Sequence, residues 1–136
     1  MMRYVLDASA MLRLFLEDGP VPNGLIEATD KAEACESIFL VPELFWAETA
    51  HVLHRRRKMG QLDSAELKRM WKDVQGLPAQ SLSHAPYLIA AMEFADAHDL
   101  SVYDALYLAI ADNFRIPLLS ADKKLHNAAA TLDLLP

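Results

Sequence analysis

The sequence predicts an α/β fold in which a central, mostly parallel sheet of four or five strands carries helices on both faces. Short apolar runs alternate with longer stretches of helical spacing, which is the pattern of parallel strands joined by crossover helices. Turn-forming residues, including Gly19-Pro20 and Gly60, separate these stretches. The length of 136 residues suits a single domain with one core, spanning residues 1–136.

The first part of the chain predicts two strands with two helices between them. Tyr4–Leu6 is a short apolar run, which is typical of a buried strand. Ala10–Leu16 follows with helical spacing until Gly19-Pro20 ends it. A second helix is predicted over Asn23–Ala34, and a second buried strand over Ser37–Val41.

Two longer helices are predicted next. Proline is favoured in the first turn of a helix, so Pro42–Met59 is expected to form a helix that Gly60 ends. Asp63 and Glu66 have the spacing of a capping box, which predicts another helix running to about Gln75.

In the last third of the chain, strands and helices are again predicted in alternation. Gly76 and Pro78 end the preceding helix, and short apolar runs again alternate with helical spacing. The predicted elements are a strand over Gln80–Ser83, helices over Tyr87–His98 and Ser101–Asn113, a strand over Ile116–Leu119, a helix over Lys123–Ala130 and an edge strand over Leu132–Leu135.

Composition narrows the classes of function. The formal net charge is −6, from 19 Asp and Glu against 13 Lys and Arg, which argues against binding a polyanion through overall charge. The basic run Arg55–Lys58 complements the end of a helix dipole, binds phosphate locally, or does both. Hydrophobic residues make up 53% of the chain, which is above average, so some apolar surface is expected to bind a partner.

Targeting signals and cofactor motifs are missing from the sequence. No apolar run approaches the ~18 residues of a membrane span, and the N-terminal residues lack the features of a signal peptide. We therefore expect a cytoplasmic protein that does not bind a membrane. Its single cysteine, Cys35, allows neither an internal disulfide nor a zinc ribbon, and its four glycines form no nucleotide-binding motif.

Four acidic residues lie beside the most apolar stretches of the chain. They are Asp7 in YVLDAS, Glu48 in PELFWAET, Asp104 in SVYDALYLAIA and Asp122 in PLLSADKKL. A carboxylate at the edge of a core is costly unless it is paired or binds a cation, and a Lys or Arg does not accompany all four acids. A shared metal ion is the simplest common explanation.

Helix capping is the structural alternative for three of these acids. Asp7 and Asp122 each precede a predicted helix, where Asp is a favoured N-cap. Ser101-x-x-Asp104 before an apolar run has the spacing of a capping box.

Capping does not explain Glu48. This residue is expected in the second turn of its helix, with Leu44 and Val52 four residues away on either side, so its carboxylate emerges between apolar neighbours. An interaction with His51, one turn further on, is the remaining structural alternative.

The chemistry of these side chains indicates which metal they would hold. Oxygen ligands without a Cys/His set select hard cations, Mg²⁺ or Mn²⁺, and such ions activate water and stabilise charge in phosphodiester cleavage. Ser9 and Ser120 stand two residues from Asp7 and Asp122, where they position a water, a carboxylate or a phosphate, or are ordinary turn hydroxyls. The histidines show no zinc-binding motif.

The order and context of the four acids resemble those of the PIN-domain nucleases, specifically the toxin ribonucleases of bacterial VapBC toxin–antitoxin pairs. The resemblance spans nearly the whole chain. Its motifs are LDAS around Asp7 and Ser9, VPELFWAE around Glu48, SVYDALYLAIA around Asp104 and SADKKL with Ser120, Asp122 and Leu125. Ser120 stands where many family members have Thr, which keeps the hydroxyl.

This resemblance implies a PIN-like three-layer sandwich and a metal-dependent endoribonuclease. It further implies that Asp7, Glu48, Asp104 and Asp122 hold Mg²⁺ or Mn²⁺, that an activated water cuts RNA, and that the partners are a second copy of the chain and an antitoxin. A PIN-type nuclease that processes RNA without an antitoxin is the alternative. Candidates for RNA contact are Arg13, Arg55 and Lys123.

Other classes fit the sequence less well. A phospho-accepting receiver domain needs an Asp at the end of a central strand, and Ser37–Val41 ends without one. A haloacid-dehalogenase-type phosphatase needs Asp-x-Asp, whereas this chain has Asp7-Ala8-Ser9. A non-catalytic α/β binding module would leave all four acids as helix caps, and Glu48 argues against it.

Overall fold

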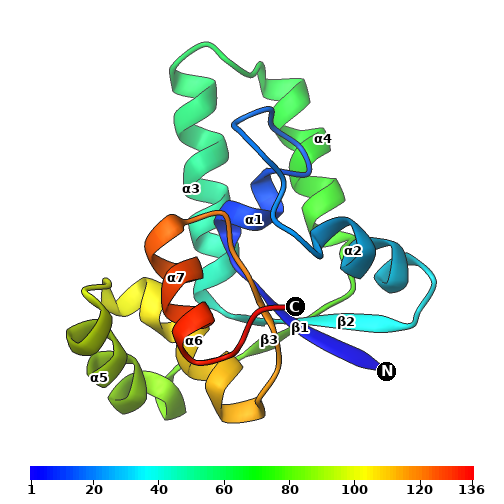
Figure 1. Ribbon diagram of the computed structural model, residues 1–136. Coiled ribbons are helices and arrows are strands. Elements are labelled where there is room, and N and C mark those ends of the chain that lie inside the picture. Colours follow the sequence, from blue (N-terminus) through cyan, green and yellow to red (C-terminus); the bar gives the residue numbers. More distant parts are fainter.

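Four strands form one parallel sheet in the order β3-β2-β1-β4. The computed structural model describes residues 1–136, and Figure 1 shows the ribbon. The sheet order places β1 between β2 and β4, so the ends of these three strands lie side by side. The strands are β1 (Met2–Leu6), β2 (Ser37–Pro42), β3 (Ala79–Leu82) and β4 (Leu118–Leu119).

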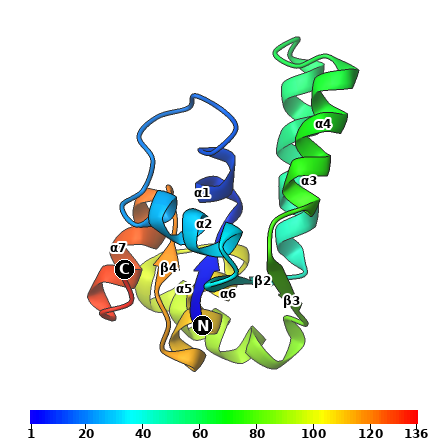
Figure 2. The ribbon, with the colours of Figure 1, turned by 90° about the vertical axis from the view of Figure 1, so that its right-hand side faces the viewer.

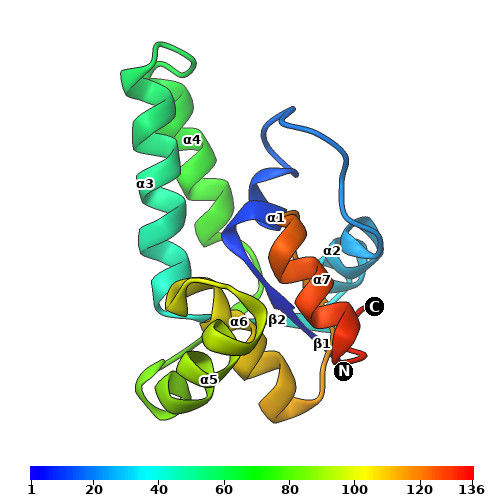
Figure 3. The ribbon, with the colours of Figure 1, turned by 60° about the vertical axis from the view of Figure 1, so that its left-hand side comes forward.

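Helices cover the sheet on both faces, as predicted. They are α1 (Ala8–Leu12), α2 (Leu25–Glu33), α3 (Leu44–Lys58), α4 (Ser64–Gln75), the 3₁₀ turn η1 (Ala85–Tyr87), α5 (Leu88–His98), α6 (Val102–Phe114) and α7 (Lys123–Thr131). Figure 2 shows α2 on one side of the sheet and α5 with α6 on the other, which is a three-layer arrangement. Helices α3 and α4 form a hairpin that extends away from the sheet (Figures 1 and 3).

The central helix of the core is α6. Seven consecutive residues, Ala105–Ala111, are buried in it. They are buried all round because α6 contacts β1, β2 and β4 and is itself covered by α5, as Figure 3 shows. A helix so enclosed has an almost continuously apolar sequence, and its polar side chains, Asp104, Asp112 and Asn113, lie toward its two ends.

Most predicted elements are confirmed, and the capping box of α4 is among them. Asp63 accepts the Glu66 N–H at 2.8 Å, and Glu66 accepts the Asp63 N–H at 3.1 Å. These two bonds satisfy backbone donors that the first turn of a helix leaves free.

The prediction that Pro42 opens α3 is wrong, because this residue ends β2. Phe39 and Glu43 donate their N–H groups toward β3, so the nitrogen of Pro42 faces β1. The pairing of β2 with β1 ends at Leu40. A proline therefore breaks no hydrogen bond at this position, and the helix begins two residues later.

Two other predicted elements differ from the structure. The helix predicted over Ala10–Leu16 ends at Leu12, after which Arg13 donates to the carbonyl three residues back, which tightens the chain into turns. The edge strand predicted over Leu132–Leu135 is absent, because Asp133 has a left-handed φ of 59°. None of the helices combines the length and the apolar sequence that spanning a membrane requires.

Candidate active site

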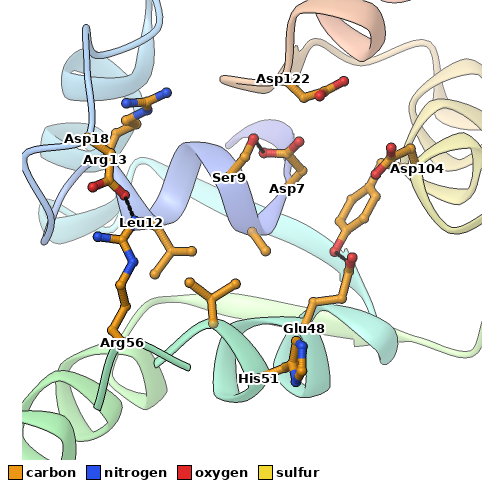
Figure 4. A pocket seen from close by; sticks show the side chains of 13 residues that line it. Asp7, Ser9, Leu12, Arg13, Asp18, Glu48, His51, Arg56, Asp104 and Asp122 are labelled. Carbon is orange, nitrogen blue, oxygen red and sulfur yellow. Dashed lines mark hydrogen bonds and ion pairs between the residues drawn. The ribbon is translucent and has the colours of Figure 1, made fainter. Parts of the chain in front are cut away.

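The four acids predicted from the sequence line one cleft at the carboxyl ends of the strands. Asp7 follows β1, Asp122 follows β4, Glu48 lies on α3 and Asp104 on α6. The cleft has a volume of about 370 Å³. Figure 4 shows these four side chains around a common space, although they come from four separate segments of the chain.

Asp7 is the most buried of these carboxylates, with 4% of its surface exposed. Its Oδ1 accepts the Ala10 N–H at 2.8 Å and the Ser9 hydroxyl at 2.7 Å. Its Oδ2 accepts the Ser120 hydroxyl at 2.5 Å. Burial raises the pKa of Asp7 to about 6, against the lowering by these hydrogen bonds, with a smaller contribution from Asp104.

Ser9 and Ser120 join the ends of β1 and β4. The Ser9 hydroxyl accepts the Ala121 N–H at 3.0 Å, and the Ser120 hydroxyl accepts the Asp122 N–H at 3.0 Å. Each serine hydroxyl therefore accepts a hydrogen bond from a backbone N–H and donates one to the Asp7 carboxylate. This network fixes the Asp7 carboxylate relative to the loop that carries Asp122.

Glu48 is held by Tyr107. The buried Tyr107 hydroxyl donates to Glu48 Oε1 at 2.6 Å, so this bond joins α3 to α6. Burial, then the negative charge of Glu48, raises the pKa of Tyr107, which keeps the phenol protonated and a donor. The pKa of Glu48 is raised by burial and by Asp104, while the Tyr107 hydrogen bond opposes the rise.

Asp104 and Asp122 face one another across the same space. Burial raises the pKa of Asp104, and the charge of Asp122 adds to this effect. Asp122 also caps α7 through the Leu125 N–H at 2.9 Å. Since like charges disfavour ionisation of their neighbours, a cation bound at this end of the cleft would stabilise the ionised carboxylates.

The capping alternative is correct for two of the acids and incomplete for the third. Asp7 and Asp122 are both N-caps, of α1 and α7. Before α6, Ser101 accepts the Asp104 N–H at 3.1 Å, and the reciprocal bond of a capping box is missing. Glu48 caps nothing and is bound by Tyr107 rather than by His51. Capping therefore accounts for part of the cluster only.

The donor set fits a hard divalent cation in its chemistry, because it consists of carboxylate oxygens with neighbouring hydroxyls. No three His, Cys, Asp or Glu side chains lie close enough together to coordinate one ion in the present arrangement. Asp7 Oδ2 and Glu48 Oε1 each accept a hydrogen bond from a hydroxyl group, and the negative charges of the carboxylates repel one another. A cation bound in this cleft would have to draw these carboxylates together.

Two arginines line the cleft beside the acids. Arg13, a sequence candidate for RNA contact, is one, and Arg56 is the other. Arg55, the second candidate, is exposed on α3 outside the cleft, and Lys123, the third, lines a separate hollow beside it.

Three polar residues of the cleft, Tyr107, Arg56 and Asp18, were not predicted as site residues from the sequence. For Tyr107 a signal existed, since it stands three residues after Asp104 and so shares a helix face with it. Arg56 is one of four consecutive basic residues, and the sequence does not show which of them faces the cleft. Asp18, in the loop after α1, had no pattern around it.

Tyr107→Phe is expected to lower the free energy of unfolding by about 1 kcal/mol at neutral pH, because Glu48 loses its donor but can still be hydrated. Urea denaturation measures this change. Tyr103→Phe is the matched control, because Tyr103 lies on the same helix with 63% of its surface exposed and should leave stability unchanged. Equal effects of the two substitutions would show that the Tyr107–Glu48 bond contributes nothing.

A family model for the PIN domain matches residues 4–131. The chain therefore belongs to the PIN-domain family, whose nucleases generally use divalent metal ions. It is 31% identical over 128 residues to Ribonuclease VapC3 of Pyrobaculum aerophilum, covering 91% of this chain and 92% of that protein. It is 29% identical over 124 residues to Ribonuclease VapC1 of Mycobacterium tuberculosis, covering 89% of this chain and 86% of that protein.

Solved structures share the fold. A Pyrobaculum aerophilum protein superimposes with a TM-score of 0.72 at 23% identity, over 93% of this chain and 79% of that one. VapC20 of Mycobacterium tuberculosis, described as a sarcin-ricin loop cleaving toxin, gives 0.63 at 16% identity, over 92% and 94%. A toxin–antitoxin complex from Klebsiella pneumoniae gives 0.56 at 19% identity, over 89% and 88%.

Proposed function

We propose that this protein is a metal-dependent endoribonuclease and the toxin of a type II toxin–antitoxin pair. The observation that carries the proposal is the convergence of Asp7, Glu48, Asp104 and Asp122 on one cleft in a PIN-domain chain. The relatives named as VapC ribonucleases and the structural neighbour named as a toxin support the RNA substrate. The proposal places the protein in the cytoplasm, where such a substrate is found.

In this proposal the four carboxylates hold Mg²⁺ or Mn²⁺. When bound, such an ion neutralises charge on the phosphodiester and lowers the pKa of the water that attacks phosphorus. Ser9 and Ser120 keep the Asp7 carboxylate in one orientation, and Tyr107 does the same for Glu48. Both serine protons are engaged with Asp7, so these hydroxyls act as positioning groups and not as nucleophiles.

The experiment that tests the nuclease activity is incubation of the protein with RNA and Mg²⁺ or Mn²⁺, followed by chelation. We expect internal cleavage with the metal, loss of cleavage with the chelator and recovery when metal is added back. Cleavage that continues at the same rate in excess chelator would contradict the proposed role of the metal. No cleavage of any single-stranded or structured RNA would contradict the nuclease assignment.

The proposal also includes a cognate antitoxin and a homodimer. Apolar side chains exposed on α5 and at the start of α6 support a partner-binding surface, and Ile89 and Met92 are 73% and 54% exposed on one face of α5. The neighbour named as a toxin–antitoxin complex supports the kind of partner. A strict monomer in sedimentation, with no gain in melting temperature on adding the adjacent gene's product, would contradict this part.

Metal binding should also stabilise the protein. An ion that binds only the folded state raises the free energy of unfolding by about 2.7 kcal/mol at a hundredfold excess over its Kd. We therefore expect the melting temperature near neutral pH to rise with Mn²⁺ concentration. The melting temperature in buffer with chelator and no added metal is the reference. A melting temperature that does not change in millimolar Mn²⁺ would contradict a metal site formed by folding.

A further inference from the structure

An ion pair crosses the end of the cleft that lies away from the four acids. Arg56 of α3 donates to Asp18, which lies in the loop between α1 and α2. Figure 4 shows this pair reaching from α3 to the loop, on the side of the cleft opposite Asp104. Both side chains are partly exposed, at 28% and 30%, so the pair is open to exchange with a ligand.

Arg13 lies beside this pair, beneath the same loop. Gly19 has a φ of +148°, which favours glycine, and a Cβ there would come within 2.3 Å of Arg13 Nη1, so the loop backbone packs directly over the guanidinium. Arg13 Nη1 is buried there without a hydrogen-bond partner. A buried charged donor that lacks an acceptor is unfavourable, and a ligand oxygen would relieve it.

These two arginines are the only Lys or Arg side chains in the cleft, which five carboxylates also line. An RNA backbone that reaches the acids meets negative charge nearly everywhere in the cleft. The RNA backbone encounters positively charged side chains only at the end of the cleft where Arg13 and Arg56 lie. Guanidinium groups bind phosphate with paired N–H donors, which makes this end suited to a phosphate next to the one that is cleaved.

We propose that Arg56, assisted by Arg13, binds a flanking phosphate of the RNA, and that Asp18 occupies Arg56 in the free protein as a competing anion. The inference rests on the proposed nuclease function. When RNA binds, a phosphate replaces the Asp18 carboxylate as the partner of Arg56. The loop that carries Asp18 and covers Arg13 is then released. Asp18 is therefore a restraint on substrate affinity that is built into the cleft.

The test is RNA affinity and KM for the substitutions Asp18→Asn and Arg56→Gln, alone and combined, in the full chain. We expect Arg56→Gln to raise KM about tenfold and to reduce the slope of log K against log salt by about 0.7, as for one lost phosphate contact on a single strand. Asp18→Asn should lower KM several-fold. The gain from Asp18→Asn should shrink when Arg56 is already Gln, which a double-mutant cycle measures.

The control for a simple change of net charge is Arg57→Gln, because Arg57 is exposed next to Arg56 but does not line the cleft. It should change KM far less than Arg56→Gln. Thermal melting checks that each variant is folded.

A lower KM for Asp18→Asn together with a higher KM for Arg56→Gln supports the proposal. If both substitutions weaken RNA binding, the pair is only a structural tie, and if Arg57→Gln equals Arg56→Gln, the effect is general charge; either result overturns the inference. In both cases the wild-type protein still cleaves RNA, so the proposed function stands. A wild-type protein that neither binds nor cleaves RNA overturns the function and this inference together.

Discussion

Glu48→Gln, Asp7→Asn and Asp104→Asn are each expected to lower the rate of RNA cleavage by about a thousandfold while the protein remains folded. Each variant removes a negative oxygen ligand from the proposed metal site, and every 1.36 kcal/mol lost from the stabilisation of the transition state costs about tenfold in rate. Single-turnover cleavage of a labelled RNA measures the effect. Asp122→Asn should matter least, because water can replace one ligand of the set.

Glu43→Gln is the matched control for these substitutions. Glu43 precedes Glu48 by little more than one turn, but it is exposed and does not line the cleft. Its substitution should leave the cleavage rate within about twofold of the wild type, as for surface changes that touch no functional group. Wild-type activity in Glu48→Gln would mean that the cluster has a structural role only.

Asp7→Asn is expected to stabilise the metal-free protein increasingly as the pH rises. The pKa of Asp7 is about 6 in the folded protein and 3.8 in its ordinary state, so the folded protein binds more protons between these values. Stability conferred by this proton is complete below pH 3.8 and is lost as the pH rises through about 6. The difference corresponds to about 3 kcal/mol, which Asn does not lose.

Denaturation of both proteins in chelator at about pH 4 and at about pH 7.5 measures this difference. Between these two pH values the gap in unfolding free energy should move by about 2 kcal/mol in favour of the variant, because the unfolded-state carboxyl is already partly ionised at about pH 4. The starting value of the gap reflects the weaker hydrogen bonding of Asn to Ser9 and Ser120. Asp96→Asn, at an exposed position on α5, is the control for general charge effects. A gap that does not change with pH would show that Asp7 is not a strained buried carboxylate.

The sequence predicted the four strands of the sheet and most of the helices because local patterns determine them. Examples are the capping box at Asp63 and Glu66 and the apolar runs of β1 and β2. Each of these patterns occupies a few consecutive residues, so it can be recognised without knowledge of the tertiary structure. The end of β2 at Pro42 was not predictable in this way. It depends on which side of the strand the proline nitrogen faces, and the sheet order sets that side.

The acids were predictable because each is a charged residue within an apolar stretch of sequence, which is unfavourable unless the charge has a partner. Their common position at the cleft follows from the sheet order, which places the ends of β1 and β4 side by side. The cleft residues that were missed are those defined by contacts between distant segments. Tyr107 and Glu48 are 59 positions apart, and Arg56 and Asp18 are 38 apart, so no local pattern links them.

The central claim is that the four carboxylates bind one or more divalent ions, and calorimetric titration of the protein with Mn²⁺ near pH 6 tests it most directly. Because Asp7 is about half protonated at this pH, ion binding should release about half a proton from it, seen as a dependence of the enthalpy on the buffer. Glu48→Gln and Asp104→Asn should weaken binding at least tenfold, and Asp7→Asn should also reduce the proton release by the share that Asp7 contributes. Mn²⁺ binding of equal affinity in the wild type and in all three variants, or no binding at all, would contradict the claim.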